Sequence, residues 1–543
     1  MAKKLSRHAF TTFWNVHAWA GVIGGLLLYV MFLSGGITLF RRQLAVWEEP
    51  LTQRRSSIEQ TGLQATLDQG LAAAGTTPEQ VWLDLPEGGL GAARIQYHAQ
   101  GEAVSSWVHE EIVPERERLS DFLYELHYLW HRATGDWLFY VGGLLCVALL
   151  LALATGVLIH LKDIVQQLHQ FRPDKRRRVL WSDMHKVLGV MGLPFQVLYA
   201  YTGAFFVFLG LLVQVFTGPV FGGDAARADL SAWGASFADE PERGAPARGL
   251  TLDELVARAR AAEPRLVPER FRIRHHGLDS GTVELRGSIE GVPFARGVVR
   301  LRATDGAVLS LDAPGAAGAR SGAFRWIYGL HYADFGGITL RILFFVLSVA
   351  TCATILTGNL IWLARREARR ESLGNRLLAR LTVGFGAGTV VAIAALFLAS
   401  RALPLDWTAR GAAEELTFIV VLGLCIAWAL AARDGGRLWW QQLGLAGLLL
   451  LPVPALAARW SGAGLFGAGQ KLAAVVAVDV ALLVTAAALC ASAWALRRAA
   501  LRHAAPPRAA QDEAPAPLAG EAPAPLVHGG AGLMARRQTA SHG

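Results

Sequence analysis

Histidines stand at the ends of long apolar segments, where an ionisable side chain is costly and therefore suggests a function. The pattern H-x-x-x-G-V-x-G occurs twice, at His17 within FWNVHAWAGVIGG and at His185 within WSDMHKVLGVMG. Each copy continues, at the same later offset, with a small or hydroxyl residue and a glycine, Ser34-Gly35 and Thr202-Gly203. This repetition indicates two copies of one structural unit.

A glycine follows each of these histidines at a spacing that places both residues on one helix face. Gly21 is expected beside His17, and Gly189 beside His185. The cleared space suits a flat macrocycle, and two imidazoles from facing helices are typical ligands of low-spin haem iron. Two alternatives stay open at this point: histidine as an anchor at the membrane boundary, and glycine for close helix packing.

Six histidines form two layers, one expected at each membrane face. If the two units are related by an axis along the membrane normal, His17 pairs with His185 and His127 pairs with His331. His131 and His160 lack histidine counterparts and are either further ligands or groups that support the ligands. His127 and His131 are also four residues apart, a spacing that can chelate a metal on one helix face.

Neither a zinc site nor a short path between the layers is evident in the sequence. A zinc site needs three or four converging ligands, usually including carboxylates or thiolates. The predicted spans contain no such side chains at the depth of the histidines. His131 and His160 are 29 residues apart, which is about 43 Å of continuous helix. An electron would need an intervening group over that distance.

The composition requires a membrane protein, with 53% hydrophobic and only 17% charged residues. A transmembrane helix takes roughly 20 apolar residues. The sequence predicts an α-helical integral membrane protein with about eight transmembrane helices, in the apolar runs 18–40, 137–159, 187–216, 342–364, 381–400, 416–432, 438–458 and 472–496.

Lysine and arginine gather in the segment between the second and third spans, after the fourth span and before the first. Basic loops stay in the cytoplasm, so we expect both termini to be cytoplasmic in a multi-pass membrane protein. The net charge of +9 is then a topology signal, and binding of nucleic acid is not expected.

Two long segments leave the membrane on the opposite side, and each reads as a short helix followed by alternating strands. We therefore predict two small α+β domains outside the membrane on that side. The predicted divisions are 1–42 N-terminus and first span; 43–126 first external domain; 127–216 second span, basic loop and third span; 217–330 second external domain; 331–366 fourth span; 367–500 four-helix membrane extension; and 501–543 disordered cytoplasmic tail.

Four motifs together resemble the PepSY-associated transmembrane helix family of iron-regulated membrane proteins. They are LHYLWH at 126–131, GVLIHLKDIVQQLHQFRP at 156–173, DMHKVLGVMGLPF at 183–195 and LHYADFGG at 330–337. The resemblance covers about residues 8–366. Members include haem-binding reductases that release iron from ferric siderophores in the periplasm. The resemblance implies PepSY folds for both external domains, a Gram-negative inner membrane and outward electron transfer.

The leading functional hypothesis is an oxidoreductase with two haem b groups that reduces ferric siderophores or other ferric chelates. No G-x-G-x-x-G follows a predicted strand, so no built-in flavin or NAD site is expected and the electron donor is separate, either cytoplasmic or a quinol. No residue is assigned a catalytic role. The alternatives are a non-enzymatic PepSY-type protein that binds peptides or regulates a peptidase, and a transporter using Asp479.

Overall fold

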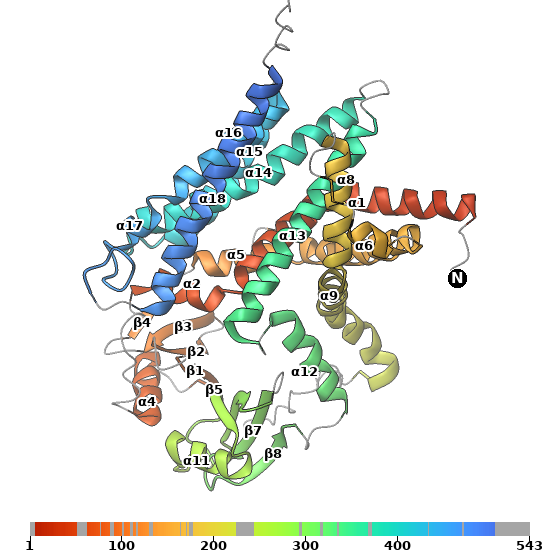
Figure 1. Ribbon diagram of the computed structural model, residues 1–543. Helices are drawn as coiled ribbons and strands as arrows, with labels where there is room; N and C mark the ends of the chain where they lie inside the picture. The colour runs from red at the N-terminus through yellow and green to blue at the C-terminus, as the bar shows by residue number, and fades with distance from the viewer. Residues whose placement is uncertain are drawn as a thin grey trace, which may run out of the picture. The chain divides into compact units, whose positions relative to one another are not determined.

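The computed structural model describes most of the chain (Figure 1). The described residues up to Arg497 belong to one compact unit. The predicted C-terminal tail lies outside the described residues from position 505 onward. The description covers residues 6–50, 62–75, 78–86, 92–99, 102–108, 112–115, 118–129, 134–162, 164–169, 171–172, 177–223, 244–292, 296–314, 319–333, 336–366, 372–432, 434–469 and 472–504.

Among the described residues, eight helices are long and apolar enough to cross a membrane, which confirms the predicted number of spans. A helix satisfies its own backbone hydrogen bonds, as a segment in lipid must. The spans are formed by α1 Arg7–Thr38, α6 Trp137–His160, α9 Leu193–Phe221, α13 Gly337–Ala364, α14 Leu373–Ala402, α15 Arg410–Ala431, α16 Gly435–Leu450 with α17 Val453–Ala457, and α18 Ala473–Ala504.

The third span is interrupted where the first is continuous. Helix α8, Arg177–Met191, ends just before α9, with Gly192 between them. Pro194 lies in the first turn of α9, where its missing N–H breaks no helical hydrogen bond. The short helix α7, Ile164–Leu168, precedes α8. Together, α8 and α9 are the second unit's equivalent of α1.

The two units pack against each other through equivalent helices. Helix α1 packs on α6 and α13, while α9 packs on α6 and α8 packs on α13. Large apolar side chains fill the space between them and exclude water from the centre of this bundle. They include Leu28, Tyr29, Phe32, Phe195 and Phe344.

Both long segments contribute strands to one antiparallel sheet, in the order β4-β3-β2-β1-β5-β6-β7-β8. The halves join where β1 pairs with β5, with Leu83 opposite Phe271. The sequence analysis expected two separate domains and did not anticipate this pairing, because an open strand edge carries no local signal of its partner. The strands are β1 Gln80–Asp84, β2 Ala93–Ala99, β3 Glu102–Val108, β4 Ile112–Pro114, β5 Leu266–Arg274, β6 Thr282–Ile289, β7 Arg296–Arg302 and β8 Val308–Asp312.

Each half of the sheet carries one helix, as the helix-then-strands pattern predicts. Helix α4 is Leu63–Ala74, and α11 is Leu252–Ala262. The second begins with a capping box, in which Thr251 and Glu254 bond each other's backbone N–H. The apolar faces of both helices share one core with the inward side chains of the strands.

A short helix leads each half-sheet back to the spans: α5, Leu119–His127, and α12, Ala319–Tyr332. Each of these helices contains a histidine near its end, and the backbone two residues later is left-handed. These residues are Leu129, with φ 59°, and Ala333, with φ 52°. Such a residue ends a helix. Helix α5 ends at His127, so the four-residue spacing between His127 and His131 extends beyond this helix, and His131 itself lies outside the described residues.

The C-terminal spans pack against α1, α5 and α13, and the short helix α2, Arg41–Glu48, adds buried polar contacts to them. Trp47 of this helix is buried, and its indole Nε1 donates to Asp479 of α18 at 2.8 Å. The second carboxylate oxygen of Asp479 accepts from the backbone N–H of Leu465 at 2.7 Å. Asp479 is therefore a hydrogen-bonding partner between segments.

Glu48 is buried beside α5, where it accepts from the backbone N–H of Ser120 at 3.1 Å. Burial raises the pKa of Glu48 to about 8, and this outweighs the lowering caused by Arg118. A folded-state pKa above the ordinary value of 4.5 means that stability falls as pH rises between these two values, because only the unfolded carboxyl ionises freely.

Glu48→Gln is therefore expected to stabilise the protein at alkaline pH, since the amide keeps the acceptor oxygen but cannot ionise. In detergent, we expect the apparent melting temperature to rise by about 2 °C or more at pH 9 and to stay unchanged at pH 4. Thermal unfolding of both proteins at both pH values checks this. Equal shifts at the two pH values would contradict it.

Candidate functional site

His17 and His185 lie together, with ring centres 6.0 Å apart and planes at 82°. Helices α1 and α8 bring them to the same depth. The Nδ1 atom of His17 is 2.8 Å from the carbonyl oxygen of Ala152, and that of His185 is 2.9 Å from the carbonyl oxygen of Thr354. The two rings are therefore held in equivalent ways by α6 and α13.

The supports of this pair repeat residue for residue. Three positions after each accepting carbonyl lies a threonine, Thr155 or Thr357. Its hydroxyl donates most closely to the carbonyl one residue earlier, at 2.6 Å from Leu151 and 2.7 Å from Ala353, and lies 3.1 or 3.0 Å from the carbonyl that the histidine contacts. The residue after each threonine is a glycine. A Cβ atom at Gly156 would lie 3.0 Å from the His17 ring, and one at Gly358 would lie 3.2 Å from the His185 ring. Only glycine lets each imidazole lie this close to the opposing helix.

His127 and His331 form the second pair, with ring centres 6.1 Å apart. The Nδ1 atom of His127 is 2.8 Å from the carbonyl oxygen of Met31. A side chain at Gly35 would overlap the same imidazole. On the other side, His331 Nδ1 is 2.7 Å from the hydroxyl of Thr202. The two short helices α5 and α12 thus place their histidines against α1 and α9.

These contacts define the tautomer of all four rings. A carbonyl oxygen only accepts, so Nδ1 of His17, His127 and His185 carries the proton. The Thr202 hydroxyl donates its proton to the carbonyl of Leu198 at 2.8 Å, so it accepts from His331. Every Nε2 atom therefore keeps a lone pair. Histidine ligands of metals are oriented in this way through their other ring nitrogen.

The pair at α5 and α12 is also kept neutral. Burial lowers the pKa of His127, and burial together with the neighbouring His127 lowers the pKa of His331 to about 3. An imidazole must be neutral to ligate a metal. At pH 7 both rings are in the required form.

In each pair the two rings lie close enough together that both imidazoles could ligate one metal ion. Across the described residues, His, Cys, Asp and Glu do not form any cluster of three or more with metal-binding geometry. A site with two imidazoles on each metal therefore fits a haem better than a zinc ion.

The two pairs are closer together than the sequence suggested. His17 belongs to the first pair, and Met31, which holds the ring of His127, lies 14 residues further along α1. This corresponds to about 21 Å of helix, half of the distance expected between His131 and His160. Aromatic rings occupy part of the interval, with Phe195 and Tyr199 centred 4.6 Å apart and Tyr199 centred 5.1 Å from His331.

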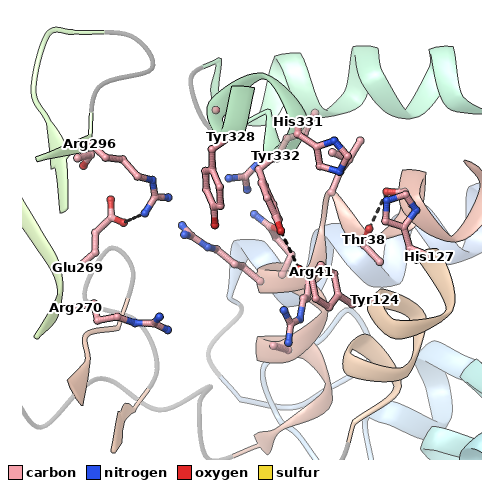
Figure 2. A pocket seen from close by; sticks show the side chains of 18 of the residues that line it. Thr38, Arg41, Tyr124, His127, Glu269, Arg270, Arg296, Tyr328, His331 and Tyr332 are labelled. Carbon is pink, nitrogen blue, oxygen red and sulfur yellow. Dashed lines mark hydrogen bonds and ion pairs between the residues drawn. The ribbon is translucent and has the colours of Figure 1, made fainter. Parts of the chain in front are cut away.

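A cavity of about 1830 Å³ opens beside the second pair and reaches the sheet. Its inner part is apolar and lies between α1, α6 and α9, where Leu28, Gly142 and Gly203 line it. Its outer part is polar. Figure 2 shows His127 and His331 on one side, tyrosines and Arg41 next to them, and Arg270 and Arg296 on the far side.

The remaining predicted residues are placed as follows. His160, at the end of α6, is close enough to His185 to affect it electrostatically. A Cβ atom at Gly21 would meet nothing within 4 Å, and one at Gly189 would meet only Thr354 at 3.8 Å. The sequence analysis missed the roles of Gly156, Gly358 and Thr202, although ATGVLIHL and LTGNLIWL already repeat across the two units.

Eight candidate spans, four of them arranged as two equivalent units around paired histidines, define a multi-pass membrane protein. The PepSY-associated TM region matches residues 14–365, which is more than half of the chain. The chain therefore belongs to the PepSY-associated TM family. It is also similar to an uncharacterised protein of Pseudomonas aeruginosa, with 30% identity over 368 residues, which cover 65% of this chain and 89% of that protein.

Proposed function

We propose that this protein is a bacterial inner-membrane oxidoreductase that carries two haem b groups and reduces ferric chelates, such as ferric siderophores, in the periplasm. His17 with His185 would hold one haem, and His127 with His331 the other. Bound haem b supplies a one-electron carrier whose potential depends on its ligands and burial. The observation that supports this best is the repeated pairing of imidazoles in one tautomer, 6.0 and 6.1 Å apart.

The protein's own residues prepare these sites. Glycines on the opposing helices leave room beside the rings, and backbone carbonyls orient them. The inner part of the cavity beside the second pair is apolar. Ligands that are held in place before binding lose little freedom when they bind.

The direction of transfer follows from the basic residues. Arg365 and Arg366, at the end of α13 near the first pair, lie over the rings of Trp14 and Trp362, at 4.2 and 3.4 Å. Tryptophan at a helix end favours a membrane boundary, and arginine beside it favours the cytoplasmic side. The sheet and the second pair would then face the periplasm. The protein would lie in the lipid membrane, and a separate cytoplasmic or quinol donor would supply electrons at the first pair.

An absorption spectrum of the purified protein, as isolated and after dithionite, tests the proposal. We expect the Soret and α bands of low-spin haem b with about two haems per chain. A folded protein prepared from haem-replete cells that shows no haem bands would contradict the proposal and favour a non-enzymatic peptide-binding role. If the protein binds haem but reduces no ferric chelate, the haem assignment is supported and the proposed reductase activity is contradicted.

Thr202→Val tests the support of His331, because valine keeps the shape of threonine but removes the acceptor of the Nδ1 proton. We expect haem at the second pair to be retained about 10- to 100-fold less tightly, and Thr202→Ser to restore it. Transfer of haem to apomyoglobin measures the retention. Thr417→Val is the matched control, since the Thr417 hydroxyl donates to Ala413 of its own helix in α15. Equal retention in both valine variants would contradict the assigned role.

A further inference from the structure

The outer part of the cavity is cationic. Eight arginines line the cavity against three carboxylates. They come from segments far apart in the sequence, including Arg41 in α2, Arg270 in β5 and Arg296 in β7. A cleft lined by one sign of charge raises the local concentration of ligands of the opposite sign.

Two of these arginines are more exposed than the carboxylates with which they pair. Arg286 is 33% exposed and its partner Glu284 5%, while Arg270 is 43% exposed and its partner Asp84 17%. In both pairs the guanidinium group is therefore the more accessible partner. The guanidinium of Arg296 bonds Glu269 at 3.3 Å and also lies over the ring of Tyr328 at 5.8 Å.

Tyrosines form the wall between the arginines and the second histidine pair. The rings of Tyr328 and Tyr332 stack with centres 4.4 Å apart, and the Tyr332 hydroxyl is 2.9 Å from that of Tyr124. Phenol side chains offer flat faces and hydrogen bonds rather than negative charge.

Figure 2 shows the order of these groups across the cavity. Arg270 and Arg296 lie at the sheet, Tyr328 and Tyr332 follow, and His331 is furthest in. A ligand that touches both arginines and tyrosines would lie directly outside the histidine pair. This is the position that a ferric chelate must take if the proposed function is right, because a bulky chelate cannot enter the packed bundle.

We propose that this cavity selects ferric chelates that are anionic and carry aromatic ligand arms, such as catecholates, over neutral aliphatic chelates. The arginines of β5, β6 and β7 would bind the negative charge, and the tyrosine wall would stack on the aromatic arms. This inference rests on the proposed function, since it assumes that a ferric chelate is the substrate.

Binding of redox-inert gallium(III) chelates to the purified full-length protein in detergent tests the selection without any electron transfer. A trianionic gallium tris-catecholate is compared with a neutral gallium trihydroxamate by isothermal titration calorimetry. We expect the anionic chelate to bind at least about tenfold more tightly and its affinity to fall with added salt. Arg270→Gln, Arg286→Gln and Arg296→Gln should each weaken it by roughly 5- to 10-fold, and the triple variant by about 100-fold.

Arg302→Gln is the matched control, because Arg302 is also on β7 and pairs with Asp305 at 2.8 Å, but does not line the cavity. Equal affinity for the two chelates, or an unchanged affinity in the triple variant, would overturn the inference. So would loss of haem in the triple variant with chelate binding intact, because the arginines would then serve the haem propionates. Tight binding of the anionic chelate without reduction of its ferric form would instead overturn the proposed function and leave the selectivity standing.

Discussion

His331→Ala is expected to remove about half of the bound haem and to lower the rate of ferric chelate reduction on the order of 100-fold or more. His127 would then lack the second imidazole, whose ring centre now lies 6.1 Å away. An iron with one protein ligand in a loosened pocket is poorly held. The first pair, about 21 Å away along α1, should keep its haem.

Two measurements check this expectation. The haem-to-protein ratio comes from the pyridine haemochrome spectrum, and the rate comes from capture of ferrous iron by a chromogenic chelator after reduction of the protein. His169→Ala is the control, since His169 is exposed and, among the described residues, its ring hydrogen-bonds only the carbonyl of Val165 in α7. Reduction by His331→Ala at the parent rate would show that electrons do not leave through the second pair.

His185→Ala is expected to remove the other half of the haem and to abolish reduction driven by the native donor. The second pair should remain loaded, and dithionite should still reduce it because it is independent of the donor. Haem content and the dithionite difference spectrum measure both effects. A full haem complement in this variant would make His17 and His185 membrane-boundary anchors.

Gly358→Leu tests the same site without touching a ligand. Even a Cβ atom at this position would lie 3.2 Å from the His185 ring, and a leucine would displace the imidazole. We expect a loss of haem similar to that of His185→Ala. Gly423→Leu is the matched control within a span, because a Cβ atom there meets nothing within 4 Å. If Gly358→Leu and Gly423→Leu retain the same haem, the glycine does not serve the histidine.

The sequence by itself determined the features that are written in short stretches of chain. Apolar runs of spanning length predicted the eight spans, and the repeated H-x-x-x-G-V-x-G pattern predicted two equivalent units. That equivalence also predicted which histidines meet: the structure brings His17 to His185 and His127 to His331. Helical period and apolarity are local properties, so they can be read directly.

Only the tertiary structure decided how the histidines are held and what lies outside them. The acceptor for His17 is 135 residues away in the sequence, and the acceptor for His127 is 96 residues away. The junction of β1 with β5 and the convergence of Arg41, Arg270 and Arg296 on one cavity likewise join distant segments. Hydrogen bonds, strand pairing and shared cavities depend on where folding places both partners, and a local pattern contains only one of them.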